Sequence, residues 1–339
     1  MPDRSFRLML LLALLGLGLF VAHLLIGPVP IGIPDVLGSL FGHDGDPGLR
    51  RIVLEVRLPE AITALCAGGG LAVCGLLMQT LFRNPLAGPS VLGISSGASL
   101  GVALLLLAGP LWGIVGSAPD LAVIIGAFSG AMVVLVLIMV ADRRMGDGVA
   151  LLIVGLMIGY LCSALISVLQ VASSEAALKG FVLWGMGSFG DVILARLPWL
   201  VLPVLAGISI ALFLVKPLNA LLLGADYAAS QGVSVRPVRR WIMWTTGLLA
   251  GVITAFCGPI AFLGLATPHV ARGLCRTSDH RVLMPVSILC GALLGLACGL
   301  VVKWPGLGEG IPLNAVTSLM GAPVVAWILL SGNRWARTA

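Results

Sequence analysis

The hydrophobic positions of this chain fall into long uninterrupted runs that are separated by short polar connections. A helix needs about 20 apolar residues to cross a hydrocarbon core of about 30 Å. Most of the runs approach that length, so the pattern predicts an all-α integral membrane protein of about ten transmembrane helices. The predicted spans are residues 8–27, 60–82, 90–109, 120–141, 148–171, 192–215, 240–258, 259–271, 282–302 and 312–332.

Two segments depart from this pattern. Residues 259–271 are short and follow Gly258, so we expect either a half-length helix or a continuation of the helix before it. Residues 173–190 are amphipathic and rich in glycine. This segment is too polar to span the membrane, which predicts a short helix near one membrane face, the periplasmic face in the orientation given below.

Composition supports a membrane protein without a separate soluble part. Of the 339 residues, 59% are hydrophobic and only 10% are charged, whereas soluble domains carry about 25% charged residues. Lipid must therefore cover most of the surface. Ten helices and their loops use the whole chain, which predicts a single transmembrane domain over residues 1–339. The first apolar run follows Arg4 and Arg7 and has nearly full membrane length, so we expect a retained helix rather than a signal peptide.

Basic residues predict the orientation, because cytoplasmic loops carry the excess of lysine and arginine. With the N-terminus inside, fourteen of the 20 lysines and arginines are cytoplasmic and both termini lie inside. The cytoplasmic set is Arg4, Arg7, Arg83, Arg143, Arg144, Lys216, Arg236, Arg239, Arg240, Arg272, Arg276, Arg281, Arg334 and Arg337. The external set is Arg50, Arg51, Arg57, Lys179, Arg196 and Lys303.

The positions of the charges argue against several classes of function. No carboxylate or lysine lies in the middle of a predicted span, whereas ion-coupled transporters usually bury ionisable groups there. None of the three lysines fits a phosphate-binding loop, so any ATPase must be a separate protein. No basic stripe with interleaved aromatic residues suggests nucleic-acid binding. The seven cysteines and four histidines share no ligand spacing, so we predict no metal site and no cofactor in this chain.

Three stretches are more specific than composition. They are Arg57-Leu58-Pro59 with the following Arg83-Asn84-Pro85-Leu86-Ala87-Gly88-Pro89-Ser90-Val91-Leu92-Gly93, then Leu223-Gly224-Ala225-Asp226, and Gly258-Pro259-Ile260-Ala261-Phe262-Leu263-Gly264-Leu265 with Thr267-Pro268-His269. In this order and spacing they closely resemble the FecCD family of permeases in type II ABC importers. That resemblance implies transport without chemistry in this chain, so we do not expect an enzyme.

The resemblance also implies the partners. They are a second permease copy that forms a dimer with the pathway at its interface, two ATPase subunits that carry ATP and magnesium, and a periplasmic substrate-binding protein in a bacterial inner membrane. It implies iron–siderophore chelates as the first cargo, with haem or cobalamin as alternatives. A stand-alone secondary transporter or channel is the alternative of another class.

The resemblance and the residue types suggest three sets of site residues. The coupling segment, about residues 217–236, contains Leu223, Gly224, Asp226, Ala229, Ser230 and Gly232. Relatives usually carry an arginine at position 229 and two acids at positions 225 and 226. The pathway candidates are Gln79, Ser95, Ser96, Gly97, Ser99, Met157, Tyr160 and Ser163. The candidates for docking the binding protein are Arg50, Arg51, Arg57, Glu60 and Lys303.

Overall fold

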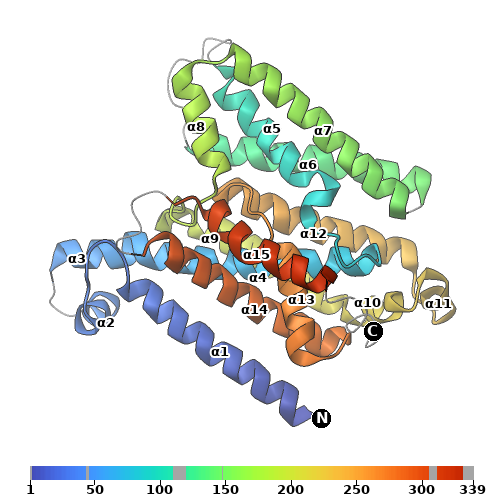
Figure 1. Ribbon diagram of the computed structural model, residues 1–339, viewed down its shortest axis with the longest axis horizontal. Helices are drawn as coiled ribbons and strands as arrows, with labels where there is room; N and C mark the ends of the chain where they lie inside the picture. Colours follow the sequence, from blue (N-terminus) through green and yellow to red (C-terminus); the bar gives the residue numbers. More distant parts are fainter. Residues whose placement is uncertain (1, 43–45, 110–119, 147, 305–310, 331–339) are drawn as a thin grey trace.

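The computed structural model of this chain describes residues 2–42, 46–109, 120–146, 148–304 and 311–330 (Figure 1). Arg334 and Arg337 of the predicted cytoplasmic set lie outside these residues, as does the end of the last predicted span. The regular elements of the described part are all helical. They are α1 (Pro2–Leu25), α2 (Ile33–Phe41), α3 (Pro47–Arg51), α4 (Leu58–Leu81), α5 (Ile94–Leu106), α6 (Asp120–Met145), α7 (Gly148–Ala172), α8 (Glu175–Gly185), α9 (Leu197–Phe213), α10 (Val215–Leu222), α11 (Ala225–Ser230), α12 (Val235–Cys257), α13 (Leu263–Cys275), α14 (His280–Val302) and α15 (Leu313–Leu330).

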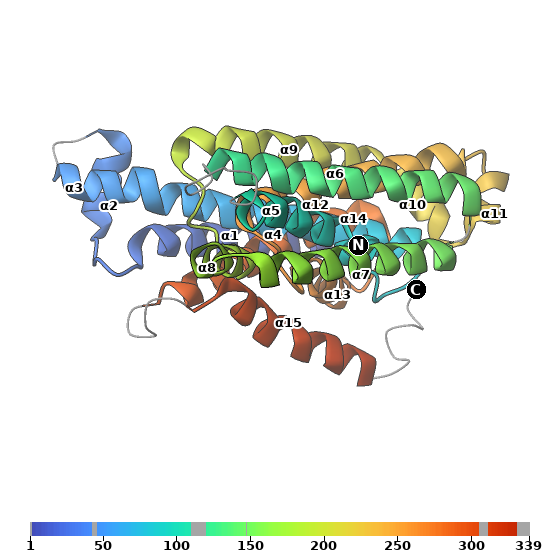
Figure 2. The ribbon, with the colours of Figure 1, turned by 90° about the horizontal axis from the view of Figure 1, so that it is seen from above.

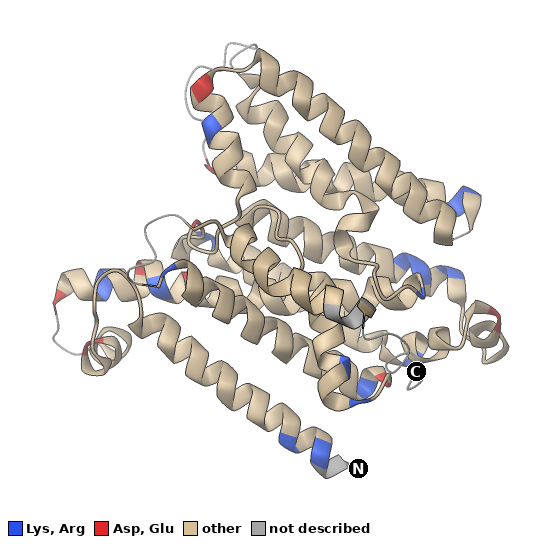
Figure 3. Ribbon diagram, viewed as in Figure 1, with Lys and Arg blue, Asp and Glu red and all other residues tan. Residues whose placement is uncertain are grey.

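Each of the ten predicted spans contains one helix, so the all-α multi-span architecture is confirmed. Seven helices in the described part are long and apolar enough to cross a membrane. They are Arg4–Leu25, Pro47–Leu81, Asp120–Met145, Gly148–Ala172, Leu194–Phe213, Val235–Cys257 and His280–Val302. Helices α5 and α15 are apolar but shorter, and α13 has 13 residues. Charged residues gather toward the ends of the bundle and are sparse in its middle (Figure 3).

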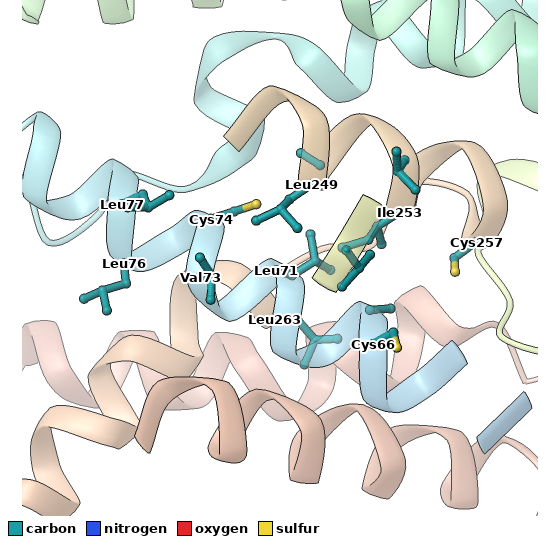
Figure 4. Close-up of a cluster of buried hydrophobic side chains, with 14 of the residues drawn as sticks. Cys66, Leu71, Val73, Cys74, Leu76, Leu77, Leu249, Ile253, Cys257 and Leu263 are labelled. Carbon is teal, nitrogen blue, oxygen red and sulfur yellow. The ribbon is translucent and has the colours of Figure 1, made fainter. Parts of the chain in front are cut away.

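Helix α4 is the centre of the bundle, packed against α9, α12, α13 and α14. A side chain at Gly68 would strike the backbone of Gly291 on α14, and one at Gly75 would strike Gly264 on α13. Small residues let membrane helices approach backbone to backbone, where van der Waals packing rather than the hydrophobic effect holds them together. Around these contacts Leu71 and Cys74 join side chains of α12 in the buried cluster of Figure 4. The glycine-rich sequence of α4 therefore serves packing.

Helices α5 to α8 form a second group, which lies beside the larger group of α1, α4, α9 and α12 to α15 (Figure 1). Its central contact is made by two glycine pairs, Gly97 and Gly101 on α5 and Gly126 and Gly130 on α6. Each pair has the four-residue spacing that places both glycines on one face of a helix. A side chain at Gly97 would strike the carbonyl of Gly130, and the reverse is also true.

A π-helical segment, Ile52–Arg57, precedes α4 and joins it to α3 in one continuous helix. Pro59 has no N–H to donate to the carbonyl of Glu55, and its ring crowds that carbonyl. The wider turn accommodates the proline, since Leu58 bonds to the carbonyl of Val53 instead. The continuous helix therefore begins at Pro47, well before the predicted span at residue 60.

The short helix α13 is separate from α12, which settles the choice left open by the sequence. The chain turns between them at Gly258, with φ of 71°, and at Phe262, with φ of 63°. A bulky residue rarely adopts a positive φ, so the surrounding structure must hold Phe262 there. Its ring packs where a side chain at Gly321 of α15 would otherwise lie. The break is thus fixed by contacts with α15.

Candidate functional site

Arg57, a predicted docking residue, is buried and bound to the end of α1. Its guanidinium caps the C-terminal end of α1, because Nη1 donates to the carbonyls of Leu24 and Leu25, both at 2.8 Å. Nη2 donates to the carbonyl of Val29. The last carbonyls of a helix have no partner within the helix, and Arg57 supplies one. With only 4% of its surface exposed, Arg57 joins α1 to α4 and offers no face for a partner, which corrects the prediction.

Lys303 and Glu60 are likewise committed within the chain. Lys303 Nζ lies 3.0 Å from Oε2 of Glu60, and both side chains are largely buried. The same ammonium donates to the carbonyl of His23 at 2.9 Å and contacts His23 Nδ1 at 2.5 Å. All three donors of the lysine are therefore used. Burial lowers the pKa of Lys303, an effect that Glu60 opposes. These residues tie α1, α4 and α14 together and are not available for docking.

Arg50 and Arg51 are the exposed members of the predicted docking set. They lie in the last turn of α3, whose first turn is capped by Asp46, which accepts from the N–H of Gly48. Arg51 pairs with Glu55 at 2.8 Å, but 78% of its side-chain surface remains exposed. The end of the bundle that carries α2 and α3 thus presents two arginines to a partner.

The serines predicted for the pathway lie at the start of α5. Ser95, Ser96 and Ser99 are partly exposed, whereas Gly97 is buried in the contact with α6 described above. Gln79 is also buried, and its amide joins two helices: Nε2 donates to the carbonyl of Leu265 at 3.2 Å, and Oε1 accepts from Arg272 at 2.6 Å. Gly97 and Gln79 therefore act in packing, which corrects their assignment as lining residues.

The three candidates on α7 are exposed. Met157 and Tyr160 have 51% and 63% of their surface free, and Ser163 is also exposed. Large exposed apolar side chains continue along α7, α8 and α15, at Val168, Leu183 and Leu319 among others. Helices α7 and α15 lie on the same side of the molecule (Figure 2). We call this surface of α7, α8 and α15 the open face.

One amide holds the elements of the open face together. Asn314, in the first turn of α15, donates to the carbonyls of Gly185 and Pro259 at 3.0 and 2.6 Å and accepts from the N–H of Ala261 at 3.0 Å. It thereby joins α8, α15 and the break between α12 and α13. Sequence reasoning missed Asn314, although a lone amide beside the Pro312 that opens an apolar run was a usable signal.

The coupling segment forms two short helices, α10 and α11, at the end of the bundle opposite α2 and α3 (Figure 1). Gly224 separates α10 from α11 with φ of 114°, a value that a residue with a side chain rarely adopts. Leu223 is 64% exposed. Asp226, Ala229, Ser230 and Gly232 are also exposed, and Gly224 is buried. An exposed leucine at the tip of a rigid turn offers an apolar contact to a partner.

A polar network connects α10 to the core of the bundle. Asn219 on α10 donates to Asp279 at 2.6 Å, and its Oδ1 lies 2.8 Å from both the N–H and Nδ1 of His280. The other ring nitrogen, Nε2, lies 2.9 Å from the hydroxyl oxygen of Thr80 on α4. The backbone N–H of Arg281, together with Asn219, holds the pKa of Asp279 below its usual range. The network thus connects α10 with α4 and with the start of α14.

His269 joins α13 to the connection that follows α4. Its Nε2 lies 2.7 Å from the carbonyl of Pro85, within the Arg-Asn-Pro stretch. Among the described residues, no group of three or more histidine, cysteine, aspartate or glutamate side chains could hold a metal ion. His269 therefore has a structural contact in place of a metal ligand set.

Comparisons with known proteins agree with this geometry. The model of the FecCD transport family matches residues 11–331. The chain belongs to the FecCD transport family. It is 35% identical over 300 residues to the vitamin B12 import system permease protein BtuC of Escherichia coli O127:H6, which covers 88% of this chain and 90% of that protein. The BtuC of Shigella boydii serotype 18 is 35% identical over 298 residues, 88% of each chain.

A solved structure extends the agreement to three dimensions. An inward-facing conformation of a putative metal-chelate type ABC transporter matches with a TM-score of 0.83 and 31% identity, over 98% of this chain and 100% of that one. The resemblance to FecCD permeases is therefore confirmed. This chain is a multi-pass permease subunit of a bacterial ABC importer, not its ATPase, and such a permease works with an ATPase and a binding protein.

Proposed function

We propose that this chain moves a metal chelate across the bacterial inner membrane, with cobalamin as the first cargo. The similarity over nearly the whole chain to permeases that import vitamin B12 supports this choice. Ferric siderophores, which the sequence analysis put first, become the second candidate because the matching structure belongs to a metal-chelate type transporter. Haem is third. Family membership leaves no support for a stand-alone carrier.

The open face is the proposed dimer interface and pathway. Exposed apolar side chains line α7, α8 and α15, and these helices also carry the predicted pathway residues Met157, Tyr160 and Ser163. A second copy placed against this face would cover these helices and enclose a cavity between the two chains. Met157, Tyr160 and Ser163 would line it, with Ser95, Ser96 and Ser99 behind them. A lining with few charges suits a large chelate, which must be released as readily as it enters.

The coupling segment is the proposed contact with the ATPase. Leu223 and Tyr227 are exposed at the tip of α10 and α11, and the network of Asn219 and His280 connects this tip to α4 and α14. Motion of the ATPase subunits on binding ATP would displace α10 as a rigid element and shift the helices of the bundle. The alanine at position 229, where relatives usually carry an arginine, predicts an apolar rather than an ionic contact.

The end with α2 and α3 is the proposed docking surface for a periplasmic binding protein. Arg50 and Arg51 would pair with carboxylates on that protein, which steers association more than it adds affinity. This assignment follows the orientation with both termini in the cytoplasm, and it puts α8 near the periplasmic face.

Stimulated ATP hydrolysis tests the cargo. The permease, its ATPase and its binding protein are reconstituted in nanodiscs, and hydrolysis is measured with cobalamin, a ferric siderophore or haem on the binding protein. The proposal predicts that cobalamin gives the largest stimulation. If a ferric siderophore stimulates and cobalamin does not, the cargo is wrong but the importer function stands.

A further inference from the structure

A groove lies between α6, α9 and α12, on the side of the molecule away from α7 and α15 (Figure 2). Its volume is about 650 Å³, within the range of small-molecule sites. Its floor and basic end belong to α12, and its walls to α6 and α9. The lining residues are Phe128, Met132, Ile210, Pro237, Arg240, Trp241, Trp244, Thr245 and Leu248.

The walls of the groove are fixed in place. Helix α12 packs between α6 and α9, and leucines fill the close approach of the helices at Gly207 and Gly247. At the basic end, Arg239 of α12 pairs with Asp142 of α6 at 2.5 Å, with both side chains largely buried. The groove is therefore a built feature of the helix packing and does not depend on the open face.

The charge at the end of the groove has no partner within the described chain. Arg240 is exposed, and no described carboxylate lies within ion-pair distance of it, in contrast to the neighbouring Arg239. Arg236, one turn before it, is also exposed. From Arg240 to Leu248 the groove runs eight residues along α12, about 12 Å at 1.5 Å per residue, and its lining over that length is almost entirely apolar.

Two further features of the groove suit a lipid: tryptophans at one end and a buried hydroxyl on the floor. Trp241 and Trp244 are 54% and 44% exposed, and tryptophan is enriched at the level of lipid headgroups. Thr245, on the floor, is 1% exposed, and its hydroxyl has no hydrogen-bond partner in the described structure. A buried hydroxyl without a partner is unfavourable, and an ester oxygen in the groove would be an acceptor for it.

We propose that this groove binds one phospholipid with an anionic headgroup. Its phosphate pairs with Arg240, and an acyl chain lies along Trp244 and Leu248 between α6 and α9. Basic pockets between membrane helices bind anionic headgroups in this way. The lipid comes from the leaflet at the end of the bundle that carries α10 and α11. Because Arg240 lies one residue from the Arg239 pair with α6, the bound lipid stabilises the junction of α12 with the second helix group.

Native mass spectrometry of the detergent-solubilised protein tests this proposal. Phosphatidylglycerol and zwitterionic phosphatidylcholine are titrated separately, and the fraction of protein carrying one lipid is measured. We expect the wild type to prefer phosphatidylglycerol. The variant Arg240→Gln should bind phosphatidylglycerol about fivefold more weakly. The loss for phosphatidylcholine should be smaller, because its choline cation offsets the charge of its phosphate. Ile210→Trp, which fills the groove, should weaken the binding of both lipids.

Arg144→Gln is the matched control, because Arg144 is exposed at the same end of α6 but does not line the groove. It should leave the preference for phosphatidylglycerol unchanged. Equal losses of phosphatidylglycerol binding in Arg144→Gln and Arg240→Gln would overturn the proposal. It would also be overturned if Arg240→Gln kept the wild-type preference for phosphatidylglycerol over phosphatidylcholine. Competition by inorganic phosphate at millimolar concentration would also overturn it, since the site would then recognise the anion without the acyl chain.

Discussion

Lys303 and Glu60 form a largely buried ion pair, with Nζ 3.0 Å from Oε2, that joins the end of α14 to the start of α4. Both residues were predicted to face a partner, and both instead hold the bundle together. Replacing Lys303 by methionine leaves a buried carboxylate without its cation, which costs about 3–5 kcal/mol of stability. We expect a clear fall in the unfolding temperature of the detergent-solubilised protein.

The double variant Lys303→Met with Glu60→Leu is the control. It removes both charges, so it should regain most of the lost stability. The single variant Glu60→Leu completes the comparison. If the loss of stability in the double variant equals the sum of the losses in Lys303→Met and Glu60→Leu, the two residues do not interact and the pairing is contradicted.

Arg57 predicts a second stability effect. The variant Arg57→Ala leaves the two last carbonyls of α1 and the carbonyl of Val29 without their donor, and we expect a loss of about 3 kcal/mol. Arg51→Ala is the matched control, since its pair with Glu55 is exposed and such pairs add little. Thermal unfolding of the two variants side by side measures the difference. Equal unfolding temperatures would mean that Arg57 does not cap α1.

The glycine contact between α5 and α6 predicts a third effect. In Gly130→Ala the added methyl group meets the carbonyl of Gly97, and we expect a loss of about 1–3 kcal/mol. Gly18→Ala on α1 adds the same methyl group where nothing lies within 4 Å, so this variant should lose no stability and should gain a little from the higher helix propensity of alanine. Comparable losses in both variants would show that the close approach of α5 and α6 does not determine the result.

Asp279 predicts a dependence on pH. The pKa of its carboxyl is held below the usual value in the folded protein, chiefly by the backbone N–H of Arg281. Its contribution to stability is therefore complete above the pKa of the unfolded chain, about 3.9, and is lost as the pH falls through the folded value. Asp279→Ala removes the N-cap of α14 and should cost about 1 kcal/mol of stability at pH 7. This loss is measured as a fall in the unfolding temperature. The gap between wild type and variant should close only below about pH 4, and a gap that closes near pH 6 would assign the effect to another group.

Most of the fold follows from the chain's apolar runs. Spans of 20 or more residues predict helices directly, and the break at Gly258 was visible as a glycine followed by a proline. The continuation of the α4 helix back to Pro47 was not predictable, because the π-helical turn before Pro59 depends on how the helix accommodates that proline.

The site residues were harder to predict, because position along the chain does not determine which side of a helix faces a partner. Arg57 lies outside the predicted span at residue 60, and its sequence context gives no sign of the carbonyls of α1, about 30 residues earlier, that bury it. Gly97 resembles a pathway residue beside two serines, but its partner Gly130 makes it a packing residue. By contrast, the exposure of Leu223 follows from its place in a short loop of two helices.

ATP-dependent transport of cargo out of proteoliposomes tests the central claim most directly. The vesicle membrane holds this chain and its ATPase, with the ATPase side facing outward. The binding protein and labelled cobalamin are inside the vesicles, and ATP is added outside. The account predicts export of label to the ATP side in the wild type and a large loss in Leu223→Asp, with the assembled complex intact. Undiminished transport in Leu223→Asp, or transport without the ATPase, would contradict it.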